Sequence, residues 1–141
     1  MRFVIALVFA VLAVVGLAQA PSYQGVATAK QIMAGMQKPA MDNLAAMNKA
    51  GGPKDDKEWE LAALHSAVLA ETAQLLVMGT RPLDQDVWLN SAQRLNAAAG
   101  SSVKAAGAKD LAAWQTSLNT MGQACRSCHK VHKKDQKKQQ Q

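Results

Sequence analysis

The feature that most constrains this chain is the run Cys125-Arg126-Ser127-Cys128-His129 near its C-terminal end. C-x-x-C-H is the attachment sequence of a c-type haem, in which two thiols add to the haem vinyl groups and the histidine offers an imidazole to iron. Two sulfurs three positions apart project from nearly the same side of a helical turn, and a histidine one step further reaches the metal. The run therefore predicts one covalently attached haem c, bound through Cys125 and Cys128, with His129 as an iron ligand.

Two other uses of a C-x-x-C pair are a thioredoxin-type redox site and half of a zinc site. The first needs an alternating strand–helix context, and the second needs further ligands, usually another cysteine pair. The chain has only these two cysteines, and its other histidines are His65 and His132. A disulfide between Cys125 and Cys128 would close almost no loop and add little stability, so a covalent cofactor is the better use of the two cysteines.

The composition favours helices. The chain has 141 residues, enough for one compact domain, and it is 49% hydrophobic but only 4% aromatic. Much of the apolar content is alanine, the best helix former, whereas the aromatic residues typical of strands are few. No strand pattern, internal repeat or phosphate-binding glycine loop is present.

Three breaks divide the chain into four amphipathic segments: Gly51-Gly52-Pro53, Gly79-Thr80-Arg81-Pro82 and Gly107. The first helix is expected from about Val26 to Lys49. Aspartates cap the others: Asp55 the second, Asp84 or Asp86 the third, and Asp110 the fourth.

Apolar residues spaced by three and four predict the face that each helix turns to the core. In the second helix Glu71 is the odd member and is expected at the edge of this face. In the fourth helix the spacing continues into the attachment run, which places the motif on the buried face of a helix. The four expected inner lines are Val26, Met33, Ala40, Leu44 and Met47; Leu61, Leu64, Val68, Leu75 and Met78; Trp88, Ala92, Leu95, Ala99 and Val103; and Leu111, Trp114, Leu118, Met121, Cys125, Cys128 and His132.

Pro39 lies inside the first helix, where it removes one backbone hydrogen bond and crowds the carbonyl of Gly35. The helix should therefore be loose or kinked at this point. Such a bend either improves packing or makes room for a flat cofactor, and the sequence does not separate the two.

These segments predict an all-α protein, an antiparallel up-down-up-down four-helix bundle with the haem near the end of the fourth helix. The N-terminus has the order of a secretory signal: Arg2, an apolar run over residues 3–17, then small residues. The run is shorter than the ~20 residues of a membrane span. We expect a signal peptide over residues 1–20, cleaved after Ala18 or Ala20, a haem-binding domain over 21–134 and a disordered polar tail over 135–141.

This pattern resembles the class II c-type cytochromes, which comprise cytochrome c-prime and its low-spin relatives. The likeness covers the mature chain and depends on Cys125–His129, on the basic Lys133 four positions after the histidine, and on Met33 within Lys30–Met33. His132 departs from the family, which often has an aromatic residue there. The resemblance implies an exported bacterial haem protein, often dimeric, that passes electrons or, when five-coordinate, binds small gases.

In such a bundle the beginning of the first helix lies beside the end of the fourth, so a methionine there could be the sixth iron ligand. Met33 and Met36 both qualify, and helical periodicity alone does not choose between them. The resemblance favours Met33. If both methionines only fill gaps in the core, the iron stays five-coordinate.

We expect the protein to carry single electrons between redox partners in the bacterial periplasm, with the haem held by Cys125, Cys128, His129 and Met33. The alternative is a five-coordinate protein that binds NO or CO. An enzyme is not expected, because a peroxidase would want a distal acid–base group and only His65 or Glu71 could be proposed.

The whole chain has a formal net charge of +6, and without Arg2 of the signal peptide 15 Lys and Arg stand against 10 Asp and Glu, a charge of +5. A basic rim beside the haem would favour an acidic redox partner and a salt-sensitive association, although the basic end could also be a solubilising tail. Nucleic acid is not expected as a partner, nor is stable membrane insertion after signal cleavage. A homodimer is implied by the resemblance alone. Six basic residues follow Cys125: Arg126, Lys130, Lys133, Lys134, Lys137 and Lys138.

Overall fold

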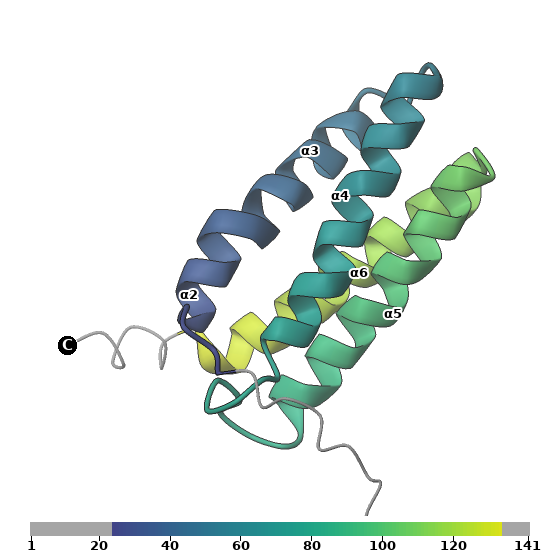
Figure 1. Cartoon of the computed structure of the whole chain (residues 1–141). Coiled ribbons are helices and arrows are strands. Elements are labelled where there is room, and N and C mark those ends of the chain that lie inside the picture. The colour runs from purple at the N-terminus through teal and green to yellow at the C-terminus, as the bar shows by residue number, and fades with distance from the viewer. Residues whose placement is uncertain (1–23, 134–141) are drawn as a thin grey trace, which may run out of the picture.

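The computed structural model describes residues 24–133, and all regular structure in this part of the chain is helical, with no strand (Figure 1). The expected all-α class is therefore confirmed, as is a bundle of four helices. The expected signal peptide with its cleavage positions and the polar tail over 135–141 lie outside the described residues.

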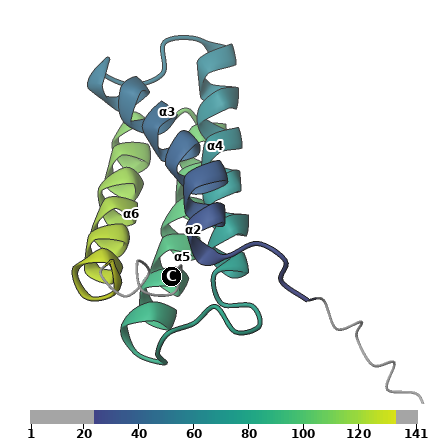
Figure 2. The ribbon, with the colours of Figure 1, turned by 90° about the vertical axis from the view of Figure 1, so that its left-hand side faces the viewer.

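The first helix is made of three segments that follow one another without a break, and each of the other three is a single α-helix. The connection between the first two helices and the connection between the last two lie at one end of the bundle (Figures 1 and 2). The start of the first helix, the connection between the second and third, and the end of the last lie at the other. The segments are α2 (Ala29–Ile32), η1 (Met33–Gln37), α3 (Lys38–Lys49), α4 (Asp56–Leu75), α5 (Val87–Gly107) and α6 (Leu111–His132).

The first helix starts later than its apolar spacing suggests. Val26 is 97% exposed and precedes the helix, so its expected place on the inner line is wrong. Thr28 is the N-cap instead: its side chain accepts from the backbone N–H of Gln31, whose side-chain oxygen accepts from the Thr28 N–H at 2.8 Å. This reciprocal pair satisfies two backbone donors and fixes the start of the helix.

The expected irregularity before Pro39 is present as one wide π-helical turn, η1. The N–H of Lys38 bonds to the carbonyl of Met33, five positions back, rather than four. Proline has no N–H and crowds the carbonyl of Gly35, and a wider turn just before it relieves both problems. The wide turn spans Met33–Gln37, the stretch that carries the expected sixth ligand.

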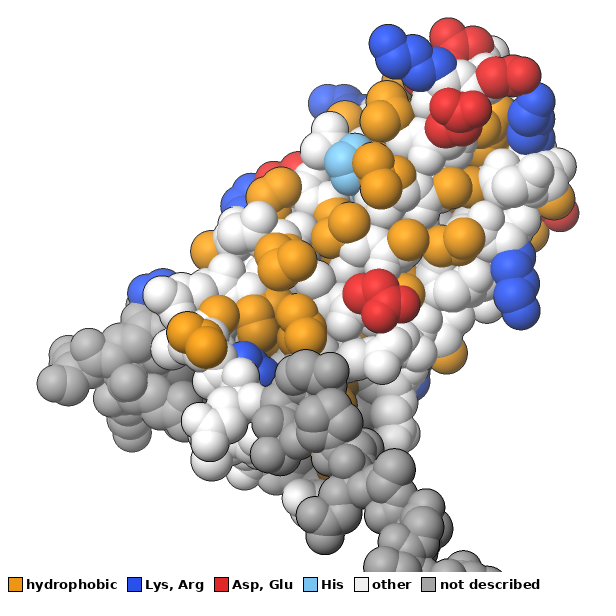
Figure 3. Space-filling model, viewed as in Figure 1, with side chains coloured by type: hydrophobic (Ala, Val, Ile, Leu, Met, Phe, Trp, Pro, Cys, Tyr) orange, Lys and Arg blue, Asp and Glu red, His pale blue; other side chains and the backbone are white. Residues whose placement is uncertain are grey.

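The expected inner line of α4 is wrong at Leu61 and Leu64, whereas Val68 and Leu75 are partly buried and pack against the core as expected. Leu64 is 56% exposed and Leu61 is 37% exposed, and hydrophobic side chains lie over α3 and α4 on the outer surface (Figure 3). Glu71 is exposed, as expected for the edge of a face. The buried positions of α4 carry mostly small side chains, which allow the neighbouring helix to approach closely. They are Ala62, Ser66, Leu69, Thr72 and Ala73.

Serine hydroxyls join α4 to α5 inside the bundle. Ser66 Oγ lies 2.8 Å from Ser102 Oγ, and it also donates to the carbonyl of Ala62 at 2.7 Å. Both serines are fully buried. The Gly100–Ser102 stretch, which lowers helix propensity, therefore stays helical because it provides a close and hydrogen-bonded contact between two helices.

The expected inner lines of α5 and α6 are largely confirmed. Val103 is only half-buried and Leu111 is 38% exposed, and every other member is buried or partly buried. Asp55 and Asp110 cap α4 and α6 as expected, accepting from Glu58 N at 2.8 Å and Ala113 N at 3.0 Å.

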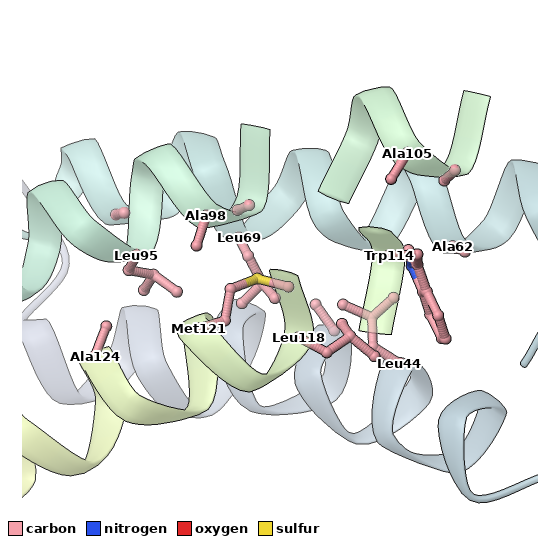
Figure 4. Close-up of a cluster of buried hydrophobic side chains, with 14 residues drawn as sticks. Leu44, Ala62, Leu69, Leu95, Ala98, Ala105, Trp114, Leu118, Met121 and Ala124 are labelled. Atoms are coloured by element: carbon pink, nitrogen blue, oxygen red, sulfur yellow. The ribbon is translucent and has the colours of Figure 1, made fainter. Parts of the chain in front are cut away.

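Two buried clusters fill the bundle. The larger one occupies its middle and includes Leu44, Leu69, Trp114, Leu118 and Met121 (Figure 4). The smaller one contains Ile32, Leu76, Trp88 and Cys128. The two cysteines therefore contact different clusters: Cys128 belongs to the smaller one, and Cys125 packs against the larger one.

Candidate functional site

A cavity of about 230 Å³ brings the four expected site residues together. Met33 comes from the first helix, and Cys125, Cys128 and His129 come from the last, so opposite ends of the described chain form one site. The exposed side chains of Lys38, Asp42 and His129 also line the cavity, which therefore reaches the protein surface.

The cavity wall is mostly apolar, with contributions from all four helices. Such a wall suits a flat apolar group and excludes water from it. The remaining lining residues are Gln37, Met41, Leu69, Leu76, Trp88, Ser91, Ala92, Leu95 and Ala124.

Helix α6 positions the attachment motif. Cys128 is 8% exposed and Cys125 is partly buried, while the intervening Arg126 and Ser127 face solvent. Neither thiol is in a disulfide. Two free thiols therefore lie on the cavity side of one helix, which is the arrangement that double attachment of a single group needs.

Burial sets the protonation of the motif. It raises the pKa of the Cys128 thiol to about 11, with smaller contributions from the negative charges of Cys125 and Asp84. It also raises the pKa of Cys125, against the opposing charge of Arg126. The pKa of His129 is lowered, first by the partial desolvation of its ring and then by the charge of Lys133. At neutral pH His129 is therefore the neutral imidazole, the form that binds a metal.

The structure distinguishes Met33 from Met36, which helical periodicity alone does not. Met33 is partly buried and lines the cavity, whereas Met36 is 44% exposed and does not. Met41 also lines the cavity, and the sequence analysis missed it. Its spacing of eight from Met33, about two helical turns, is the pattern that could have found it.

His132 is buried in a polar network beside the cavity. It is 5% exposed, its Nε2 lies 2.7 Å from Asp84 Oδ2, and its ring meets that of Trp88 edge-on with centroids 5.6 Å apart. The indole N–H of Trp88 donates to the carbonyl of Leu76 at 2.8 Å. This network ties the end of α6 to the start of α5 and fixes Trp88 in the cavity wall.

Asp84 supports this network from the connection before α5. It accepts from the backbone N–H of Trp88 at 3.0 Å, so it caps α5 by its side chain, while Asp86 stands at the N-cap position without a side-chain bond. The Trp88 hydrogen bond, assisted by the charge of His132, lowers the pKa of Asp84 against the effect of desolvation. The sequence predicted Asp84 or Asp86 as the cap and did not predict the pairing of Asp84 with His132.

Gln37 is a further cavity residue that the sequence analysis missed. It is 9% exposed, and its side-chain Nε2 is buried with no hydrogen-bond partner among the residues that the structure describes. Nothing in its spacing distinguished it, because a glutamine beside a lysine normally lies on a solvated helix face. At the cavity mouth its neighbour Lys38 forms an ion pair with Asp42.

Zinc binding and peroxidase chemistry each require particular residue groups at the cavity. Within residues 24–133 no group of three or more histidine, cysteine or acidic side chains could hold a metal ion, as a zinc site would require. His65 and Glu71, the acid–base candidates for a peroxidase, do not line the cavity. No helix in the described part of the chain is long and apolar enough to span a membrane.

The residues present fit a haem c. Two free thiols, a neutral imidazole and a thioether line one largely apolar cavity, and a buried amide donor in its wall still lacks an acceptor. No protein-family model matches this chain, and no curated protein or solved structure was found to be similar to it.

Proposed function

We propose that this protein is an exported, bacterial, monohaem c-type cytochrome that carries single electrons between periplasmic redox partners. One observation carries the proposal: Met33, Cys125, Cys128 and His129 line the same cavity, although they come from the first and last helices. An attachment motif on a solvated helix face would give no such support.

Each residue has a distinct role in the proposal. Cys125 and Cys128 hold the haem through two thioether bonds, so it does not exchange with other proteins. His129 offers a neutral imidazole from α6, and Met33 offers a thioether from the first helix. The haem supplies one-electron chemistry, and a thioether ligand raises its reduction potential.

The surrounding side chains set the environment of that chemistry. Trp88 and Leu76 from the smaller cluster, and Leu69 and Leu95 from the larger one, keep water from the cavity walls. A dry wall disfavours the extra positive charge of the oxidised state and so tunes the potential upwards. Because His129 is exposed at the cavity, the haem edge on that side would be accessible to a redox partner.

The proposal includes an antiparallel up-down-up-down order of the helices. That order puts the beginning of the first helix beside the end of the last, where the sixth ligand and the proximal histidine must meet. The shared position of these two ends in Figure 2 supports it.

Mass spectrometry of protein matured in a bacterial periplasm tests the attachment. We expect the wild type to carry one haem through two bonds, and Cys125→Ala or Cys128→Ala to lose two-bond attachment. Ser127→Ala is the matched control, because this exposed residue lies between the two cysteines. Full two-bond attachment in either cysteine variant would refute the proposal.

Absorption spectra in both oxidation states, with and without carbon monoxide, then test the type of function. A low-spin spectrum that carbon monoxide leaves unchanged supports electron transfer with Met33 bound. A high-spin wild type that binds carbon monoxide readily would instead assign the protein to five-coordinate gas binding.

A further inference from the structure

Gln37 is a buried hydrogen-bond donor whose acceptor is missing from the described chain. It is 9% exposed, and its Nε2 is buried without a partner. A buried polar group without a partner destabilises the fold, and such groups are usually satisfied by a ligand or by water. Trp114 Nε1 is also buried without a partner, but Trp114 lies in the larger cluster and does not line the cavity.

The position of Gln37 relates it to Met33. The two residues are the first and last of the wide turn η1, and both line the cavity. The bond from Lys38 N–H to the carbonyl of Met33 closes this turn immediately after Gln37. An amide donor therefore lies one turn from the thioether on the same wall of the cavity.

The adjacent polar group is already engaged. Lys38 pairs with Asp42 at the cavity mouth, and both of these side chains are exposed. Gln37, in contrast, is inside the cavity wall, where the low dielectric makes a missing acceptor most costly. An acceptor that enters the cavity with the bound group would satisfy this donor.

We propose that Gln37 donates a hydrogen bond from Nε2 to the ligand in the sixth position of the iron. This inference rests on the proposed function. The acceptor is the sulfur of Met33 when that residue is bound, and the outer atom of a diatomic molecule when Met33 is displaced. Gln37 is a positioning and tuning residue here, because distal hydrogen-bond donors change both the potential and the ligand preference of a haem.

The test compares Gln37→Leu in two backgrounds. In the wild-type background the loss of a donor to the thioether should lower the reduction potential, because a hydrogen bond weakens electron donation from sulfur to iron. In the Met33→Ala background, with the ferrous protein under carbon monoxide, the C–O stretch should move to higher frequency, because a distal donor favours back-donation into carbon monoxide.

Gln93→Leu is the matched control, since Gln93 is exposed on α5 and does not line the cavity. It should change neither the potential nor the stretch. Gln37→Ala serves as the second variant if Gln37→Leu fails to accumulate.

The outcomes separate the possible acceptors. A lower potential alone supports the thioether as acceptor, and a shifted C–O stretch alone supports a diatomic ligand. An unchanged stretch with an altered pH dependence of the potential would identify a haem propionate as the acceptor and overturn the proposal. No change in either measurement also overturns it. If the chain takes up no haem, the proposed function itself is refuted. Mass spectrometry detects that outcome independently of the potential and of the C–O stretch.

Discussion

At the scale of single residues, three methionines of the first helix are candidates for the sixth iron ligand. They differ in burial and in whether they line the cavity. Met33 and Met41 line the cavity, whereas Met36 is 44% exposed on the outer side of the wide turn. Met41 is two turns further along the first helix than Met33. We therefore keep Met33 as the proposed iron ligand and regard Met41 as part of the wall.

Met33→Ala should convert a low-spin haem into one that binds carbon monoxide readily. The substitution removes the only thioether that the proposal places on the iron, which leaves the sixth position open. Met36→Ala and Met41→Ala are the controls and should keep the low-spin spectrum. If Met41→Ala gives the conversion and Met33→Ala does not, the ligand assignment is wrong.

Asp84 should make the protein sensitive to acid. Its pKa is lowered in the folded state from the ordinary aspartate value of 3.8, so the stabilisation it gives is complete above that value and is lost as the pH falls through the folded pKa. Asp84→Asn should lower the urea midpoint at pH 7, and this difference from the wild type should shrink below about pH 4. Asp86→Asn, which removes no side-chain cap bond, should lower the midpoint less. A difference that is the same at pH 3 and pH 7 would contradict the assignment.

At the scale of elements, the wide turn and the buried face of α4 show how packing overrides simple periodicity. Pro39 forces a π turn onto the first helix, and that turn carries both Met33 and Gln37 into the cavity wall. Small residues on α4 turn inward because α5 lies close against them through Ser66 and Ser102. Leu61 and Leu64 of α4 are left exposed.

Leu69→Ala and Leu64→Ala make a matched pair for the face of α4. Leu69 is 1% exposed, so its truncation should lower the free energy of unfolding by about 2–5 kcal/mol. Leu64 is 56% exposed, and its truncation should change that free energy by only about 0.5 kcal/mol. Urea unfolding followed by circular dichroism measures both. Equal losses of unfolding free energy in the two variants would support the predicted inner line, in which Leu64 faces the core.

At the scale of the whole molecule, basic side chains gather at the end of the bundle that carries the cavity. Arg126, Lys130 and Lys133 are exposed on the last turns of α6, and the exposed Lys38 lies at the cavity mouth. Such a surface attracts acidic partners electrostatically, and salt screens this attraction. We propose it as the docking surface for the redox partner.

Charge reversal at Lys130 and Lys133 should slow electron transfer to hexacyanoferrate(III), a small anionic oxidant, and flatten its dependence on ionic strength. Lys57→Glu is the control, because this exposed lysine lies in the first turn of α4, at the other end of the bundle. Stopped-flow rates between low and high salt measure the effect. A wild-type rate constant that does not change with ionic strength would contradict the proposed docking surface.

The sequence by itself determined the features that depend on neighbours along the chain. The caps at Asp55 and Asp110, the breaks between helices and the irregularity before Pro39 all follow from local backbone chemistry. The attachment motif is also local, because five consecutive residues define it. The spacing into Cys128 correctly placed that residue on the buried face of its helix.

Only the tertiary structure decided which face of α4 is inside, which methionine lines the cavity, and how the buried polar groups pair. Ser66 with Ser102 and His132 with Asp84 are contacts between residues far apart in the chain. Periodicity measures how apolar a helix face is, but it cannot measure how closely a neighbouring helix approaches. The burial of Gln37 likewise depends on four helices meeting around one cavity, and no local pattern in the sequence encodes that meeting.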